Sequence, residues 1–379
     1  AMKTLFLFNP ENDLALACNR SNYSAPRNAL ELRHSAALLP LWYSDEGDTV
    51  LATNGYDQRW LDDIRNKFSL SAAIKSDLRG EEIEHASPWG WSLNSRSQFL
   101  AAGVDPHILP SEAQINNIRL NSHRRTTIAI LSAMQTQGLY PGEIPVELSQ
   151  VDELPALVSR FMTDGIFLKS PWSSTGRGVI PSSGKTPENL LKQASGIIRR
   201  QGSVMVEKAY RKVRDFAMLF SKIKGQSVRY IGLSLFDTTS QAYTGNILAP
   251  EQQLNETLAH DIPSERIEEI RNAIIPILTN YISDDYEGYF GVDMMIVESD
   301  DGSRWIHPCV EVNLRMTMGV VAHIFRNRYL DPGVSGRFAV SFGQGREQVA
   351  PVIENGRLMR GTLHIVPPGG KFIVTVTVG

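Results

Sequence analysis

Glu311-Val312-Asn313-Leu314-Arg315 is the stretch that decides the fold, together with Asp293 in the apolar run 290–297. Side chains two residues apart on a β-strand project from the same face, so Glu311 and Asn313 would present two oxygens side by side. Asp293 interrupts apolar strand residues, where an unpaired carboxylate would be costly. The turn 299–302 would fold the two strands into a hairpin. Because such oxygens suit Mg²⁺, the pattern predicts a divalent-cation site, and if a nucleotide binds elsewhere in the chain, its phosphates should end here.

A second stretch predicts where those phosphates would be held. Residues 166–169 form a short apolar run that ends in Lys169, and a loop rich in serine, threonine and glycine follows at 170–178. Such a loop lets backbone amides approach phosphate oxygens, and the lysine adds a point charge. We therefore expect a phosphate-covering hairpin here. The next strand, 203–207, ends in Glu207.

A competing phosphate motif lies just downstream. The segment from Gly178 to Gly184-Lys185-Thr186 is nearly a P-loop, but five residues separate the glycines where the motif has four. Pro181 also stands inside it, where free backbone amides are needed. The favoured interpretation is a turn that leads into a helix capped by Thr186.

Taken together, these features are similar to those of the ATP-grasp superfamily. The resemblance covers about residues 120–330 and consists, in order, of Lys169, the loop 173–178, the segment 204–210, Asp293 and Glu311-Val312-Asn313. Each piece alone is weak, whereas five in this order are specific. The resemblance implies that ATP lies between two α+β subdomains.

The resemblance also implies a role for each matching residue. Lys169 would contact the α-phosphate and the adenine side, and Asp215 would bind the ribose. The loop that closes over the β- and γ-phosphates would be Ser173, Ser174, Thr175, Gly176, Arg177 and Gly178. The adenine-binding hinge, which pairs through its backbone, would be Glu207, Lys208, Ala209 and Tyr210. The metal ligands would be Asp293, Glu311 and Asn313, with Glu311 bridging two Mg²⁺ ions, which Mn²⁺ could replace.

The chain departs from the family pattern at two cationic positions. Many members carry a second ATP-binding lysine where this chain has Arg124 and Arg125, so one of these would have to substitute. Some ligases place an arginine just before the equivalent of Asp293, where this chain has none. Arg315 is the candidate replacement and catalytic residue, because the Glu-x-Asn-x-Arg form resembles members that act on bicarbonate or amino-acid carboxylates. The alternative is a plain helix-surface arginine.

Several of these residues could have an ordinary structural role instead of the one that the resemblance implies. Glu207 and Asp215 could be surface acids, and Asn313 could simply end its strand as a turn residue. Loops at the strand ends of the first domain commonly line the substrate side of such sites. The candidates there are Asn9, Glu11, Asn12 and Asp13, for which a core or capping role is an equal alternative.

The order of elements predicts an α/β protein, with an ATP-grasp fold preceded by a small Rossmann-like α/β domain. The expected units are an N-terminal domain at 1–120, ATP-grasp subdomain A at 121–206 and subdomain B with the metal site at 207–330. Residues 331–379 would pack on the ATP-grasp domain as a C-terminal tail.

The predicted activity is an ATP- and Mg²⁺-dependent ligase. It would join a carboxylate, amino-acid or peptide-like, to an amine through an acylphosphate. Two alternatives keep the fold: an ATP-grasp phosphotransferase that phosphorylates a hydroxyl, and a nucleotide-binding protein without turnover.

Composition excludes several other classes. The 379 residues include 38 basic and 41 acidic side chains, so a net charge of −3 offers no footprint for nucleic acid or an anionic membrane. The two cysteines, Cys18 and Cys309, match no zinc or redox spacing and are expected to be reduced thiols. The sequence shows neither a signal-peptide pattern nor a long apolar run, so a cytoplasmic protein is expected. Its partners would be small molecules, and it could act as a homodimer.

Overall fold

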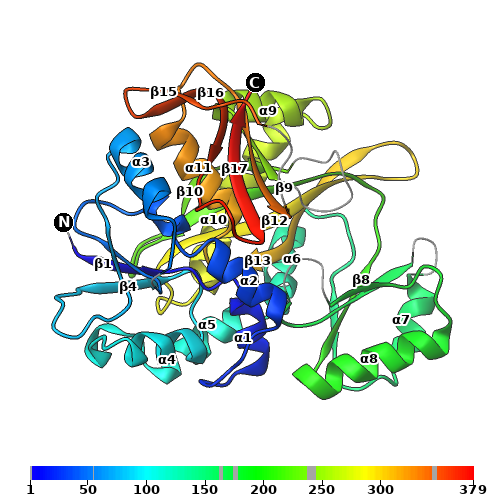
Figure 1. Cartoon of the computed structure of the whole chain (residues 1–379). Coiled ribbons are helices and arrows are strands. Elements are labelled where there is room, and N and C mark those ends of the chain that lie inside the picture. Colours follow the sequence, from blue (N-terminus) through cyan, green and yellow to red (C-terminus); the bar gives the residue numbers. More distant parts are fainter. Residues whose placement is uncertain (1, 54, 162–164, 174–177, 237–244, 344–347) are drawn as a thin grey trace.

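The computed structural model describes residues 2–53, 55–161, 165–173, 178–236, 245–343 and 348–379. Within these ranges the chain forms four β-sheets with helices packed around them (Figure 1). The predicted α/β class is therefore confirmed.

The first sheet is parallel, with strand order β3-β2-β1-β4. Its strands are β1 (Thr4–Leu7), β2 (Thr49–Leu51), β3 (Ala73–Lys75) and β4 (His85–Pro88). The helices of this region are α1 (Asn12–Cys18), α2 (Arg27–Ser35), η1 (Leu39–Trp42), α3 (Gln58–Phe68), α4 (Leu93–Ala101), η2 (Pro106–Ile108) and α5 (Glu112–Ser122). Leu5 and Leu7 enter one core while Phe8 enters another, so both faces of the sheet are covered, as parallel sheets require.

The second sheet is antiparallel and contains the predicted hairpin. Its order is β5-β8-β6-β7, with β5 (Val146–Leu148), β6 (Ile166–Lys169), β7 (Val179–Pro181) and β8 (Val204–Lys208). Its helices are α7 (Leu154–Arg160) and α8 (Pro187–Gln201). Thr186 caps α8 by accepting a hydrogen bond from the amide of Asn189 at 3.3 Å, so the favoured turn-and-cap interpretation is confirmed over the P-loop. These elements have a core of their own and lie to the right in Figure 1.

The third sheet carries the predicted metal ligands and is antiparallel, in the order β10-β9-β12-β13. Its strands are β9 (Lys212–Lys222), β10 (Arg229–Leu235), β12 (Gly288–Glu298) and β13 (Arg304–Asn313). The contacting helices are α6 (Thr126–Thr136), α9 (Glu251–Ala259), α10 (Ser264–Tyr281) and α11 (Met318–Tyr329). The turn 299–302 joins β12 to β13 as predicted, with the amide of Gly302 donating to the carbonyl of Ser299.

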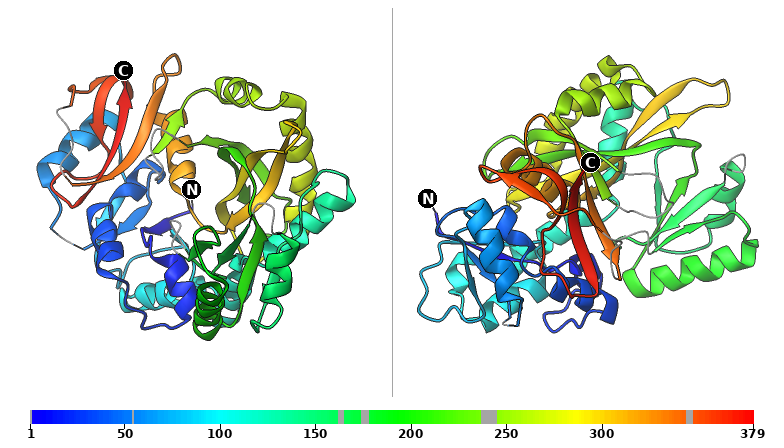
Figure 2. Two further views of the ribbon diagram at one scale, coloured as in Figure 1. Left: turned by 90° about the vertical axis from the view of Figure 1, so that its right-hand side faces the viewer. Right: turned by 45° about the horizontal axis from the view of Figure 1, so that its top comes forward.

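The last sheet has five strands in the order β11-β14-β17-β16-β15. They are β11 (Gly245–Leu248), β14 (Gly336–Phe342), β15 (Val352–Glu354), β16 (Arg357–His364) and β17 (Phe372–Val378). This sheet shares a core with α11 and with the first domain, where the Trp42 indole donates to the carbonyl of Ile365 at 2.6 Å. The second sheet lies on the far side of the molecule from the first domain in the right-hand view of Figure 2.

Among the residues that the structure describes, no helix is both long enough and apolar enough to cross a membrane.

Candidate active site

The candidate active site is a cavity of about 270 Å³ between the third sheet and the start of α11. It contains the three predicted metal ligands, Arg315 and Ser173. The other lining residues come from β9, β10, β12 and the chain around the start of α11: Ala217, Leu219, Ser234, Phe236, Gly291, Thr317, Met318 and Gly319.

The hairpin of β12 and β13 brings the three metal-ligand candidates together. Asp293 and Glu311 are directly opposite in the strand register. The amide Nδ2 of Asn313 donates to Oδ2 of Asp293 at 3.1 Å. Two carboxylates and a carboxamide thus share one face of two paired strands, as the sequence predicts.

Pro308 lies inside β13, between the pairs that bring the metal-ligand candidates together and the rest of the hairpin. β13 is an edge strand, and its register with β12 shifts between the Asp293–Glu311 pair and the Met295–His307 pair. A proline is tolerated at such an edge or bulge because it cannot donate to the ladder. Pro308 thus lies where the sheet offers both an edge and a register shift.

The electrostatics of the cavity favour a cation. Burial, followed by the charge of nearby Glu311, raises the pKa of Asp293 to about 7. A hard divalent ion would relieve both effects, and the oxygen donors present fit Mg²⁺ or Mn²⁺. No group of three or more His, Cys, Asp or Glu side chains placed to hold a metal occurs in the described part of the chain. The protein would therefore supply two carboxylates and an amide, and water or phosphate would supply the remaining ligands.

Arg124 is the arginine that the structure places at this site. Its Nη2 lies 3.0 Å from Oε1 of Glu311 and donates to Oγ of Ser173 at 3.0 Å. Its Nε donates to the carbonyl of Ser170 at 2.9 Å. Arg125 instead pairs with Glu147 at 2.9 Å, away from the cavity. Arg124 thus ties the start of the glycine-rich loop to the metal-ligand candidates.

The predicted phosphate loop begins and ends in the described structure, whereas Ser174, Thr175, Gly176 and Arg177 lie outside the described residues. The amide of Ser170 donates to the carbonyl of Gly178 at 2.8 Å, which closes the base of the β6–β7 hairpin. Gly178 has φ +80°, and a Cβ there would lie 2.7 Å from Oγ of Ser170. Only glycine suits this position without displacing its neighbour.

Lys169 and Glu207 form a buried ion pair between β6 and β8. Lys169 is 7% exposed. Glu207 therefore contacts the predicted phosphate-binding lysine and is not a free surface acid. Neither residue lines the 270 Å³ cavity, which has Ser173 at that side.

The predicted adenine hinge is partly engaged within the protein. The Ala209 amide donates to the carbonyl of Gly165 at 2.9 Å, so this backbone group is not available to a base in the present arrangement. The Tyr210 hydroxyl accepts from the amide of Glu143 at 2.7 Å, and its ring contacts His307. The side chain of Lys208 lies near that ring.

Asp215 is not brought into the cavity. It forms a partly exposed pair with Lys212 at 2.5 Å on β9. The surface-acid interpretation describes its position in this structure, although its charge is close enough to contribute to the raised pKa of Asp293.

The first-domain candidates Asn9, Glu11 and Asn12 are buried and do not line the cavity. Asn9 donates to the carbonyl of Gly90 at 2.9 Å and accepts from its amide at 3.3 Å, so it joins the loops after β1 and β4. Glu11 pairs with Arg33 at 2.7 Å. In this structure Asn9 and Asn12 occupy the buried positions of the structural alternative, and a role toward a substrate stays a prediction. Glu11 retains one buried oxygen, Oε2, without a hydrogen-bond partner.

Arg315 lines the cavity and is not a helix-surface arginine. Its Nη2 donates to Oδ1 of Asn313 at 3.0 Å, and its Nη1 donates to the carbonyl of Met316 at 3.1 Å. Its Nε donates to Asp13 at 2.9 Å. The guanidinium therefore sits beside the metal-ligand candidates in a fixed orientation.

Ser234 and Thr317 line the cavity without having been predicted. Thr317 caps α11 by accepting from the amide of Val320 at 3.1 Å, which a threonine before an apolar run could have signalled. Ser234 lies on β10 and accepts from Asn246 at 2.5 Å. No local pattern marks it, because its place depends on strand pairing across the sheet.

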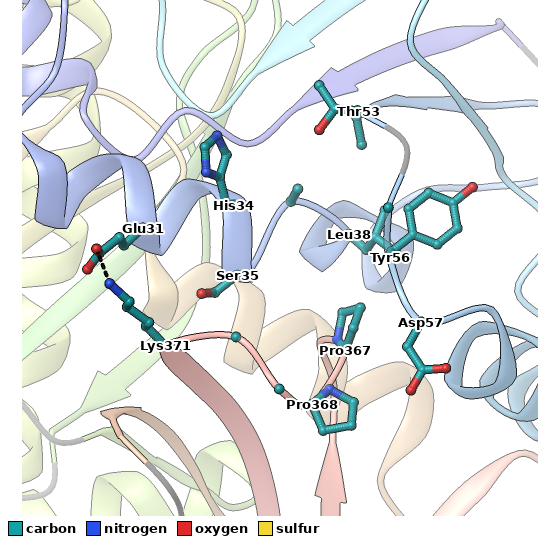
Figure 3. Close-up of a pocket in the computed structure, with 15 residues that line it drawn as sticks. Glu31, His34, Ser35, Leu38, Thr53, Tyr56, Asp57, Pro367, Pro368 and Lys371 are labelled. Atoms are coloured by element: carbon teal, nitrogen blue, oxygen red, sulfur yellow. Dashed lines mark hydrogen bonds and ion pairs between the residues drawn. The ribbon is translucent and has the colours of Figure 1, made fainter.

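A larger cavity of about 750 Å³ lies elsewhere (Figure 3). It is lined by residues of α2, the loop after β2 and residues 367–371, and Glu31 and Lys371, which both line it, form an ion pair. None of the predicted site residues lines it, so its size alone assigns it no role.

Comparison with known proteins supports the fold. No protein-family model matches the sequence, and no curated protein matches it. Biotin carboxylase from Campylobacter jejuni, solved as a β,γ-ATP complex, matches with a TM-score of 0.53 at 12% identity, covering 100% of this chain and 88% of that chain.

Two further solved structures are less similar. The biotin carboxylase domain of 2-oxoglutarate carboxylase from Hydrogenobacter thermophilus has a TM-score of 0.49 at 13% identity, covering 99% of this chain and 86% of that chain. L-amino acid ligase from Bacillus licheniformis has a TM-score of 0.44 at 13% identity, covering 100% and 94%.

Proposed function

We propose that this chain, which has the ATP-grasp fold, is an ATP- and Mg²⁺-dependent ligase that joins a small carboxylate to an amine. The observation that carries the proposal is the convergence of Asp293, Glu311, Asn313 and Arg315 at one cavity. A second arginine, Arg124, contacts the cavity residues Glu311 and Ser173 without lining the cavity itself. Oxygen donors for a cation and fixed positive charges are what phosphoryl transfer to a carboxylate needs, because that reaction depends on positioning and charge stabilisation.

Asp293, Glu311 and Asn313 would hold the cation. When bound, a divalent cation neutralises phosphate charge and orients the transferring group. In the protein itself, Arg124 contacts both Glu311 and Ser173, and would place positive charge where the phosphate loop meets the metal ligands.

The reaction would have two balanced steps. An oxygen of the substrate carboxylate attacks the γ-phosphorus, the bond to ADP breaks, and an acylphosphate and ADP result. The amine nitrogen then attacks the acyl carbon, phosphate departs with the bonding electron pair, and the amine loses its proton to phosphate or water. Arg315, fixed beside Asn313, would hold the carboxylate. No protein nucleophile is needed in either step.

The cavity volume supports small substrates. About 270 Å³ is slightly below the usual range for ligand pockets, which favours an amino-acid-sized carboxylate over a larger one. We also propose the four units at 1–120, 121–206, 207–330 and 331–379 as the functional division of the chain. The last of these forms a sheet with β11 and packs on both the first domain and α11.

A hydroxylamine trap tests the proposed activity. We expect hydroxamate and ADP when the protein is given ATP, Mg²⁺, hydroxylamine and pools of carboxylic acids, because only an activated acyl group yields a hydroxamate. Glu311→Gln should form neither product while keeping its circular-dichroism spectrum. Glu354→Gln, a change at an exposed residue, is the matched control and should remain active.

Three results would contradict the proposal. ADP formation that depends on an alcohol and gives no hydroxamate would instead identify a phosphotransferase. ATP binding without ADP release under every pool would identify a nucleotide-binding protein. Undiminished ADP formation in Glu311→Gln would refute the metal assignment.

A further inference from the structure

Asp13 reaches the candidate active site from the first domain. It lies in the first turn of α1, yet it contacts Arg315, which is 302 residues away in the sequence. Nε of Arg315 donates to Oδ2 of Asp13 at 2.9 Å, and Nη2 lies 2.9 Å from the same oxygen. The two side chains are only 15% and 16% exposed. A largely buried ion pair of this kind often adds little to the free energy of unfolding, because desolvating both charges is costly. A role in the site is therefore the better explanation of this contact.

The contact continues through Arg315 to the metal-ligand candidates. Nη2 of Arg315 donates to Oδ1 of Asn313 at 3.0 Å, and Nδ2 of Asn313 donates to Oδ2 of Asp293 at 3.1 Å. Because a guanidinium can only donate, Arg315 fixes which end of the Asn313 amide is oxygen. That oxygen accepts one hydrogen bond here and keeps a second lone pair for a cation.

We propose that Asp13 is a positioning residue for the cation site. It holds Arg315 from the first domain, and Arg315 in turn orients the amide oxygen of Asn313. The inference rests on the cation site of the proposed function, although not on the identity of the reaction.

Asp13 also keeps the guanidinium away from the two carboxylates of the cation site, Glu311 and Asp293. Arg315 already feels the charges of Glu311 and Asp293. Without Asp13, those two carboxylates are the nearby acids to which the guanidinium would turn, and it would then compete with the cation. Partners that orient metal ligands typically contribute about 10- to 100-fold to metal affinity.

Removing the Asp13 charge should leave the domain contact in place. The amide of Met316, next to Arg315, donates to the carbonyl of Trp89 at 2.8 Å and is a separate link to the first domain. The effect of a change at Asp13 on cation binding can therefore be measured while the first domain stays in contact with the segment around Arg315.

The test is a double-mutant cycle on Mn²⁺ affinity, measured from the free-ion electron paramagnetic resonance signal in the presence of a non-hydrolysable ATP analogue. We expect Asp13→Asn to weaken Mn²⁺ binding by about tenfold or more. In the Arg315→Ala background the same change should have no further effect, because its target is absent. Glu31→Gln is the matched control: Glu31 is 16% exposed and pairs with Lys371, 340 residues away, so binding should not change.

The outcomes separate this inference from the proposed function. Additive effects of Asp13→Asn and Arg315→Ala would overturn it, as would a wild-type protein that binds no Mn²⁺. A coupled cycle without any hydroxamate formation would support the positioning role and refute the ligase. If Asp13→Asn does not fold, Asp13→Glu replaces it in the double-mutant cycle. This variant keeps the charge but moves the carboxylate by one methylene, so Mn²⁺ binding should again weaken only when Arg315 is present.

Discussion

At the scale of the residue, Asp293 places a carboxylate within the otherwise largely apolar strand β12. It stands between Val292 and Met294, which are both buried in the core, while its own side chain faces the candidate cavity. A carboxylate in that position is costly without a compensating charge. The neighbouring charge of Glu311 adds to the cost, so the cation-free protein carries a locally unfavourable arrangement that a cation would relieve.

This arrangement predicts that cation affinity rises with pH. The pKa of Asp293 is raised from 3.8 to about 7, so the folded, cation-free protein holds a proton there that a cation must displace. The stability contributed by this proton is fully present below pH 3.8 and is lost as pH rises through about 7. The increase in melting temperature on adding Mg²⁺ should therefore be larger at about pH 8 than at about pH 5.5.

Asp293→Asn is the control for this prediction, and it should show little Mg²⁺-dependent shift at either pH. Equal shifts at both pH values in the wild-type protein would contradict the assignment. A pH-dependent shift that persists in Asp293→Asn would show that another group titrates.

At the scale of elements, the two hairpins that form the site depend on special backbone positions. β13 accommodates Pro308 as an edge strand with a register shift. The β6–β7 hairpin depends on Gly178, which approaches Ser170 closely. Ser170 in turn accepts a hydrogen bond from Arg124, so the shape of this hairpin is linked to the metal-ligand candidates.

Gly178→Ala is expected to weaken binding of Mg·ADP more than Gly184→Ala. Both glycines have positive φ, +80° and +72°, so each alanine should cost about 1–2 kcal/mol of backbone strain. Only at Gly178 would the new Cβ also displace Ser170, because nothing lies within 4 Å of the Cβ position at Gly184. Calorimetric titration with Mg·ADP and thermal melts of both variants measure this difference, and equal loss of affinity would contradict it.

At the scale of the whole molecule, the C-terminal sheet, which is the five-stranded sheet β11-β14-β17-β16-β15, shares a hydrophobic core with the first domain. Trp42 is fully buried between them, contacts Phe68, Phe325 and Tyr329, and donates to the carbonyl of Ile365. The second sheet has its own core. The chain is thus organised around cores that combine segments distant in sequence.

Trp42→Ala should destabilise the first domain and the C-terminal sheet together. Loss of a buried tryptophan typically costs about 3–5 kcal/mol, and the carbonyl of Ile365 would also lose its donor. Urea unfolding followed by hydrogen exchange should show reduced protection in β1, β2, β16 and β17 at once. Phe342→Ala, at a side chain that is 68% exposed, is the control and should change stability by less than about 0.5 kcal/mol. Reduced protection in only one of the two parts would show that they unfold separately.

The sequence by itself was enough to predict the α/β class, the ATP-grasp fold and the grouping of Asp293, Glu311 and Asn313. These three residues lie on two strands joined by a short turn, so strand alternation and the turn residues bring them together. Tertiary structure alone decided that Arg124 and not Arg125 enters the site, that Asn9 holds Gly90, and that Asp13 holds Arg315. Those contacts join segments that no local periodicity relates, because only the packing of separate sheets brings them within hydrogen-bonding distance.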